Sequence, residues 1–255
     1  MALPTPPPLW REGLVGLEAA ALLRSGVWRG EGVQRGDSDP VLLIPGFLAG
    51  DGSLGVMTRW LRTQGYRTRK AGIRANVDCS AIVADGLEAR LEQMAATTGR
   101  RVAIVGQSRG GVIARVLAVR RPDLVSGIVT LGSPCCGQLR VHPLVALQIG
   151  LVGTLGALKV PHLFSHSCLR GECCSEFRTT LCADVPDGVG FVSVYSKRDG
   201  IVDWRACLDA GAECLEVSSS HCGMAVNRDV YRIVGDALAA FRRADTPGVG
   251  VARAA

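Results

Sequence analysis

The Gly-Gln-Ser-Arg-Gly segment at residues 106–110 carries the clearest chemical signal in this chain, because it joins a short apolar strand directly to a helix. A serine on so sharp a strand-to-helix turn has a strained backbone, and small residues two positions before and after it avoid a steric clash. The helix expected at about 110–120 directs its positive end and free N–H groups to where an oxyanion would form. We predict that Ser108 is a nucleophile that attacks a carbonyl carbon.

A serine nucleophile needs a general base, and the imidazole of histidine has a pKa suited to that role near neutral pH. The chain has four histidines. His221 follows the last predicted strand, and strand ends deliver side chains to the carboxyl edge of a parallel sheet. We therefore predict that His221 is the base. The other three lie in a long inserted segment and are expected not to act as the base: His142, His162 and His166.

The imidazole in turn needs a carboxylate that fixes its tautomer and stabilises the imidazolium. Asp199 lies in the turn just after the strand that precedes the histidine strand, and Gly200 permits a tight loop there. Asp203 is the alternative, but it is better placed to cap the short helix after Trp204. We predict Asp199 as the third member, which gives the chain order Ser, Asp, His.

A tetrahedral intermediate needs two hydrogen-bond donors for its oxyanion. One is usually the N–H after the nucleophile, which here belongs to Arg109. The other should come from the loop after the first core strand, where Phe47 N–H is the natural candidate and Gly46 lets the backbone turn toward Ser108. Pro45-Gly46 by itself is also compatible with a simple turn.

The elements that must position these residues alternate between strands and helices. Strands are expected at 41–45, 66–70, 102–105, 127–131, 191–196 and 214–217, and helices at 12–24, 53–64, 79–97, 110–120 and 232–243. This alternation predicts a mostly parallel α/β sheet covered by helices. We expect one domain, with an N-terminal extension at 1–40, a core at 41–134 and 190–243, an inserted cap at 135–189, and a flexible tail at 244–255.

The inserted segment is far longer than an ordinary connection. Residues 141–158 contain no Asp, Glu, Lys or Arg, a length that just reaches that of a membrane span. Both flanks of the segment must return to the same sheet, so we expect it to form an apolar cap over the site. Such a cap could contact a membrane without spanning it. A membrane-spanning helix and an ordinary core helix are the alternatives. An apolar cap favours an apolar substrate.

From Val41 to Phe241 the chain resembles the α/β-hydrolase family, in particular its bacterial lipase and esterase branch. The resemblance rests on the Pro45-Gly46-Phe47 loop, the serine elbow, and the late Asp199-Gly200 and His221. In the lipases the first position of that loop is commonly His, which helps to hold the loop, and here it is Pro45. The resemblance implies hydrolysis of carboxylic esters or thioesters through an acyl-serine intermediate, with no cofactor and no metal at the site.

Two further functions stay open at this point. Acyl transfer to an alcohol, amine or thiol would use the same three residues in a drier site. A non-catalytic binding protein on the same fold is the other alternative, because a fold does not determine a function.

Composition and charge indicate which classes of partner and which cellular location to expect. The 255 residues are 47% hydrophobic with a mean hydropathy of +0.23, enough for one substantial core. The net charge is +6, but its arginines are scattered and no basic run is interleaved with aromatic residues, so we expect no nucleic-acid binding. The proline-rich start lacks the pattern of a secretory signal, so a cytoplasmic location is expected. Oligomeric state is not predicted.

Ten cysteines are many for a reducing compartment, and all but Cys79 lie after residue 134. Their spacing does not match a standard zinc pattern. For the run Cys168, Cys173, Cys174 and Cys182, a metal site, a local disulfide and unpaired thiols all stay open, with unpaired thiols as the simplest expectation.

Overall fold

A single six-stranded sheet organises the protein. The computed structural model describes residues 9–136 and 140–245. The strand order is β2-β1-β3-β4-β5-β6, and every neighbouring pair among these strands is parallel. The strands are β1 (Pro40–Ile44), β2 (Arg67–Lys70), β3 (Val102–Gln107), β4 (Val125–Leu131), β5 (Gly190–Tyr195) and β6 (Glu213–Glu216). Each lies within two residues of its expected range.

Both faces of the sheet are buried, as parallel sheets require. Every residue of β1, β3 and β4 is buried, and successive side chains enter different cores. In β1, Leu43 packs into the cluster beneath α1, α2 and α8, whereas Leu42 packs into the cluster beneath α3, α4 and α7. The two outer strands β2 and β6 expose most of their charged residues, which is why they end the sheet.

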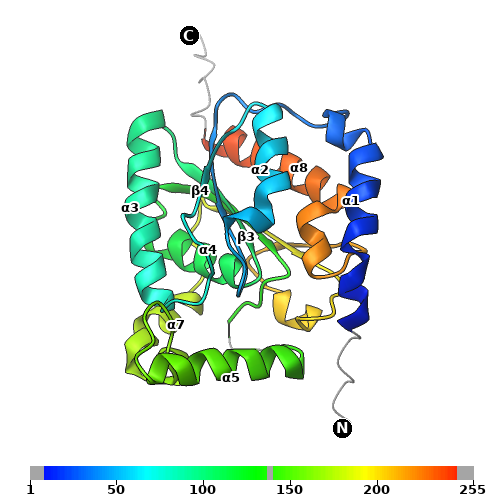
Figure 1. The fold of residues 1–255 in the computed structure, drawn as a ribbon. Coiled ribbons are helices and arrows are strands. Elements are labelled where there is room, and N and C mark those ends of the chain that lie inside the picture. The colour runs from blue at the N-terminus through cyan, green and yellow to red at the C-terminus, as the bar shows by residue number, and fades with distance from the viewer. Residues whose placement is uncertain (1–8, 137–139, 246–255) are drawn as a thin grey trace.

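The helices cover the two faces as separate layers (Figure 1). One layer holds α1 (Val15–Arg24), α2 (Gly55–Thr63) and α8 (Arg228–Asp245), and the other holds α3 (Ser80–Thr98) and α4 (Arg109–Arg120). Helix α8 begins four residues earlier than expected and continues to Asp245, two residues into the range expected as a tail; the remainder of that range lies outside the described residues. Outside the inserted segment, the described chain also has five short 3-10 helices: η1 (Leu9–Leu14), η2 (Val27–Arg29), η3 (Asp51–Leu54), η5 (Trp204–Cys207) and η6 (Cys222–Val226).

The part of the inserted segment at 140–189 is mainly helical, and Figure 1 shows its helix α5 lying across one end of the sheet; we refer to this part as the cap. It contains α5 (Pro143–Ala157), α6 (His166–Arg170), η4 (Glu172–Cys174) and α7 (Ser175–Leu181). Among the described helices, none is long and apolar enough to cross a membrane. Most of the uncharged stretch at 141–158 forms the 15-residue helix α5, which begins at Pro143, and the His142 side chain accepts a hydrogen bond from Leu144 N–H at its start.

The carboxyl ends of the parallel strands meet beneath this cap. The residue after β3 is Ser108, Gly132 follows β4, and Asp199 and His221 lie in the loops after β5 and β6. Parallel sheets collect functional residues at this edge because every strand ends there in a loop. Residues more than a hundred positions apart in the chain are therefore placed in one site.

Candidate active site

Ser108 occupies a strained turn between β3 and α4. Its φ of 50° and ψ of −121° are values that a non-glycine residue rarely adopts. The turn is tight because a side chain at position 106 would lie 2.5 Å from the carbonyl oxygen of Gly110, and one at position 110 would overlap the carbonyl of Ile44. The expected need for small residues on either side of the serine is thus a direct steric requirement.

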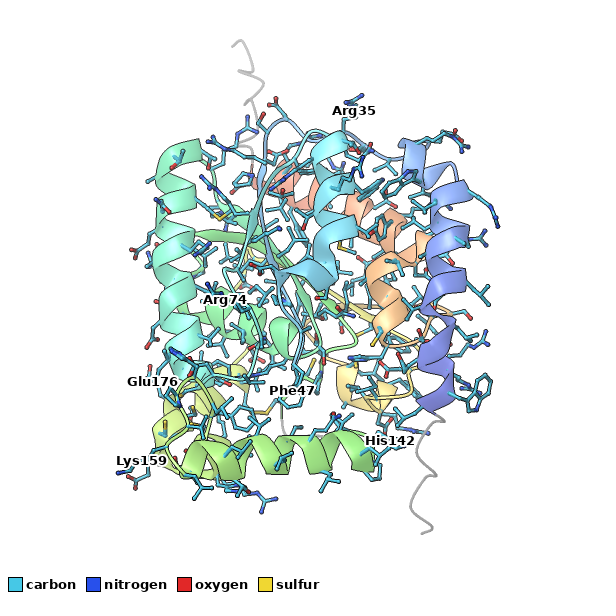
Figure 2. The ribbon with its side chains drawn as sticks, viewed as in Figure 1. Arg35, Phe47, Arg74, His142, Lys159 and Glu176 are labelled. Atoms are coloured by element: carbon cyan, nitrogen blue, oxygen red, sulfur yellow. A yellow bond between two sulfur atoms is a disulfide. The ribbon has the colours of Figure 1, made fainter. Side chains whose placement is uncertain are left out.

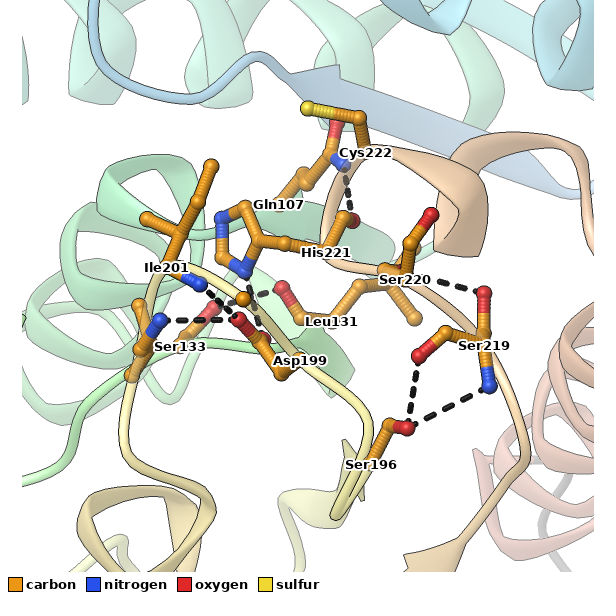
Figure 3. Close-up of polar contacts among 12 residues, drawn as sticks. Gln107, Leu131, Ser133, Ser196, Asp199, Ile201, Ser219, Ser220, His221 and Cys222 are labelled. Carbon is orange, nitrogen blue, oxygen red and sulfur yellow. Dashed lines mark hydrogen bonds and ion pairs between the residues drawn. The ribbon is translucent and has the colours of Figure 1, made fainter. Parts of the chain in front are cut away.

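Asp199 and His221 form a buried pair (Figure 3). The Nδ1 atom of His221 lies 2.6 Å from Oδ2 of Asp199, and both side chains are almost fully buried. The other carboxylate oxygen accepts hydrogen bonds of 2.8 Å from the N–H groups of Ile201 and Val202. These bonds hold the carboxylate in one orientation, so Nδ1 of the imidazole is directed to Asp199 and Nε2 takes no part in this pair.

The charge on Asp199 decides the protonation of His221. Burial lowers the pKa of His221, but the adjacent Asp199 carboxylate, with a smaller contribution from Glu12, raises it more, so the pKa lies above the ordinary value of 6.5. A raised pKa makes the neutral imidazole a stronger proton acceptor, and it also keeps the ring protonated to higher pH.

Ser108 and His221 line the same cavity, which has a volume of about 560 Å³ and lies between the sheet edge and the cap. The wall is mostly apolar; from the cap it includes Val145, Ile149, Phe164, Phe177 and Leu181. Figure 2 shows Phe47 in the space between the sheet edge and α5, and its ring lies 6.1 Å from that of Phe164. The cavity is large enough for an acyl chain or a compound of similar size.

The two candidate oxyanion donors also border this cavity. Phe47 and Arg109 line it beside Ser108, and Gly46 is so close to the serine that a side chain there would lie 3.2 Å from its Cβ atom. The loop is held by Asn76, whose side-chain NH₂ donates to the carbonyl oxygen of Pro45 at 2.7 Å. Asn76 thus supports a loop in which Pro45 offers no polar side chain.

The Arg109 side chain has a structural task of its own. Its guanidinium donates to the carbonyl oxygens of Asn76 and Asp78 and, at 3.0 Å, to the hydroxyl of Ser80. Burial lowers the pKa of Arg109 to about 10, and it remains a cation at neutral pH. The residue that follows Ser108 therefore fixes the 76–80 segment, which runs beneath the cap.

Two carboxylates from the N-terminal segment support the histidine loop, and sequence analysis did not identify them. Glu12 accepts hydrogen bonds from the N–H groups of Gly200, His221 and Cys222 at 2.8–3.0 Å. Glu18 accepts from the side chains of Ser219, Ser220 and Asn227 and from Ser220 N–H. These two glutamates are the only charged residues between Arg11 and Arg24, but nothing in the sequence around them points to partners so far along the chain.

Gly132 is a second residue that sequence analysis missed. It has a φ of +57°, and a Cβ atom there would lie 3.0 Å from both Oδ2 of Asp199 and Nδ1 of His221. A glycine is favoured at this position both by the backbone conformation and by the space taken by the Asp199–His221 pair.

The remaining predicted residues lie apart from the pair. Asp203 caps η5 by accepting a hydrogen bond from Arg205 N–H at 3.0 Å, as its sequence position suggested, and it also pairs with Arg205 and Arg140. The three other histidines lie in or beside the cap, where His166 contacts Thr154 and His162 lies 3.4 Å from Asp78.

The parallel sheet, the serine elbow after β3 and the late Asp and His loops define an α/β-hydrolase fold, which confirms the resemblance noted from the sequence at the level of the fold. No family model matches the chain.

Solved structures with this fold include several esterases and lipases. A metagenomic carboxyl esterase superposes with a TM-score of 0.60 at 15% identity over 82% of this chain and 77% of its own. The mature form of a Bacillus licheniformis lipase gives 0.58 at 15% identity over 79% and 92%. A soluble variant of Saccharomyces cerevisiae monoglyceride lipase, in complex with a substrate analogue, gives 0.55 at 15% identity over 85% and 89%.

Proposed function

We propose that this protein is a serine hydrolase that cleaves carboxylic esters with apolar acyl groups. The observation that carries the proposal is the buried Asp199–His221 pair, joined at 2.6 Å, at the same cavity as a serine on a strained elbow. The comparison with solved structures supports this proposal, because proteins with this fold include carboxyl esterases and lipases.

In the proposed mechanism, Nε2 of His221 takes the proton of the Ser108 hydroxyl as Oγ attacks the ester carbonyl. The N–H groups of Phe47 and Arg109 hold the oxyanion of the tetrahedral intermediate. Collapse of this intermediate breaks the ester bond, and the imidazolium gives its proton to the departing alcohol. Water, deprotonated by His221, then attacks the acyl-serine and releases the acid and the free serine.

The apolar cavity wall supports an apolar acyl group as the substrate. The outer face of α5 supports a lipid source for that group, because it carries a helical stripe of exposed leucines at positions 144, 147, 151, 155 and 158. Contact between this stripe and a lipid surface would bring the cap to its substrate. The cytoplasmic location stays a prediction, and the Cys136–Cys182 disulfide is of a kind that is uncommon there.

The first experiment measures hydrolysis of p-nitrophenyl esters of increasing chain length, together with labelling by a serine-directed phosphonate. Ser108→Ala should lose about 10⁴-fold or more in kcat and should not be labelled, with folding unchanged. Ser175→Ala, which alters an exposed serine of the cap, is the matched control and should retain both properties. Full activity of Ser108→Ala would refute the mechanism, and absence of labelling in the wild type would favour a binding protein.

A second experiment tests the lipid surface. Replacing Leu147 and Leu151 together by Asn should leave hydrolysis of a soluble short-chain ester unchanged, because both side chains are exposed. Hydrolysis of an emulsified long-chain ester should fall several-fold, since the apolar area available to the lipid surface is reduced. Equal effects on the two substrates would contradict a role in surface contact.

A further inference from the structure

Four cysteines gather where the cap meets the core, and the proposed ester chemistry does not use them. They are Cys79 at the start of α3, Cys168 in α6, and Cys173 and Cys174 in η4. All four sulfur atoms lie within 4.8 Å of one another. Cys79 and Cys174 are buried, Cys168 is half-buried and Cys173 is exposed, so the cluster lies at the edge of the core.

The spacing of the sulfur atoms suits metal ligands. The Cys79 sulfur lies 3.3 Å from that of Cys174 and 3.7 Å from that of Cys173, and the sulfurs of Cys168 and Cys173 are 3.6 Å apart. Four thiolates at about 2.3 Å from a tetrahedral Zn²⁺ have their sulfurs about 3.8 Å from one another. Sulfurs in a disulfide are about 2.05 Å apart, so these thiols are not paired with one another.

We propose that Cys79, Cys168, Cys173 and Cys174 form a structural tetrathiolate site for Zn²⁺ that fastens the cap to the core. Four sulfur ligands close the coordination shell of zinc and leave no position for substrate or water. The role is therefore structural.

The arrangement explains why the cysteine spacing gave no zinc pattern. Three ligands lie within seven residues of the cap, but the fourth comes from the core, 94 residues before Cys173. A metal at this place would cross-link two segments whose other contacts include side-chain packing, the His162–Asp78 contact at 3.4 Å, and the bond from Phe164 N–H to the carbonyl oxygen of Val77 at 2.7 Å.

The surrounding residues already shape the chain for such a site. The guanidinium of Arg178 donates to the carbonyl oxygens of Cys168 and Gly171, which holds the loop between the cap ligands in a compact turn. On the core side, Arg109 binds Asp78 and Ser80, the two neighbours of Cys79. The Arg109 cation also lies where it can offset part of the net negative charge of a zinc tetrathiolate.

The site would also stabilise the substrate cavity. Cys168 itself lines that cavity, and Phe177 and Leu181, which follow the last cap ligand, do so as well. A metal bound to Cys79 would restrain the 76–80 segment, which Arg109 already holds by hydrogen bonds. Loss of the metal should therefore loosen the cap and lower the melting temperature, since binding energy at a structural zinc site contributes to folding.

The test measures zinc by elemental analysis of the full chain purified without chelator, and the visible absorption of the protein after exchange with Co²⁺. We expect one zinc per chain and the strong sulfur-to-cobalt absorption of a tetrahedral thiolate site. Cys173→Ser removes the exposed ligand with little effect on packing, and its zinc affinity should fall by at least about 100-fold. Cys214→Ser, which alters a cysteine on β6, is the control and should retain zinc.

Two results would overturn the proposal. One is that the reduced wild-type protein, titrated with Zn²⁺ in the absence of oxygen, binds no more metal than Cys173→Ser. The other is that peptide mapping of the native protein finds two disulfides among these four cysteines. Circular dichroism of each variant shows whether it is folded, and Cys168→Ser provides a second ligand variant. Metal content does not depend on ester hydrolysis, so this result is independent of the proposed function.

Discussion

Gly132→Ala should impair catalysis by moving the Asp199–His221 pair, and Gly99→Ala provides a control with the same backbone cost. Both glycines have a positive φ, +57° at Gly132 and +66° at Gly99. A Cβ atom at 99 would meet no atom within 4 Å, whereas one at 132 would lie 3.0 Å from each partner of the pair. Each variant should lose about 1–2 kcal/mol of stability, because the left-handed backbone is unfavourable for alanine.

The additional effect at 132 follows from the distances. Ordinary contacts begin at 3.4 Å, so the pair must retreat from 3.0 Å by 0.4 Å. If a displacement of 1 Å costs about 100-fold in rate, 0.4 Å costs roughly sixfold. The assay is kcat/KM on a soluble ester at a temperature where both variants are folded, with the folded fraction measured by circular dichroism. Equal kcat/KM values for Gly132→Ala and Gly99→Ala would refute the steric argument.

Two further predictions concern the same pair. Asp199→Asn should reduce kcat by about 10⁴-fold, because the amide no longer holds the required tautomer of His221. Asp203→Asn should change kcat little and should only weaken the N-terminal cap of η5. Equal losses of kcat in the two variants would contradict the choice of Asp199. Because the pKa of His221 is raised, kcat/KM should rise through an apparent pKa above 6.5, and Glu12→Gln should shift this acid limb to lower pH by removing a nearby negative charge. A pH–rate profile that is identical in the wild type and Glu12→Gln would show that Glu12 does not influence the base.

Much of the fold could be predicted from the sequence because the central strands β1, β3, β4 and β5 are short, mostly apolar runs, whereas the outer strands β2 and β6 were placed by their position in the alternation of strands and helices. The serine elbow was predictable because its tight turn restricts residue types at fixed positions, and Asp199 and His221 were predictable as partners because parallel strands deliver their loops to one edge. The structure brings these two side chains into contact, although their catalytic roles stay predictions.

The residues that support the Asp199–His221 pair were harder to predict from the sequence, because their partners are distant in the chain. Nothing near Glu18 indicates that it will accept hydrogen bonds from residues about 200 positions later. Gly132 looks like any turn glycine until the carboxylate and imidazole beside it are known. The cysteines illustrate the same limit, because Cys182 pairs with Cys136 rather than with its nearest neighbours in sequence.

The contacts of Glu12 have a consequence for the order of events during synthesis. Its carboxylate is synthesised well before the N–H groups that it binds, which lie 188 to 210 residues later. At about 5–20 residues per second, translation of that interval takes roughly 10–40 s. The serine elbow at 106–110 is synthesised about halfway through this interval, and for the remainder the nascent chain carries the elbow without its histidine loop. The contacts that Glu12 makes beside the Asp199–His221 pair therefore form only after the loop that follows β6 has been synthesised, when that loop packs onto η1.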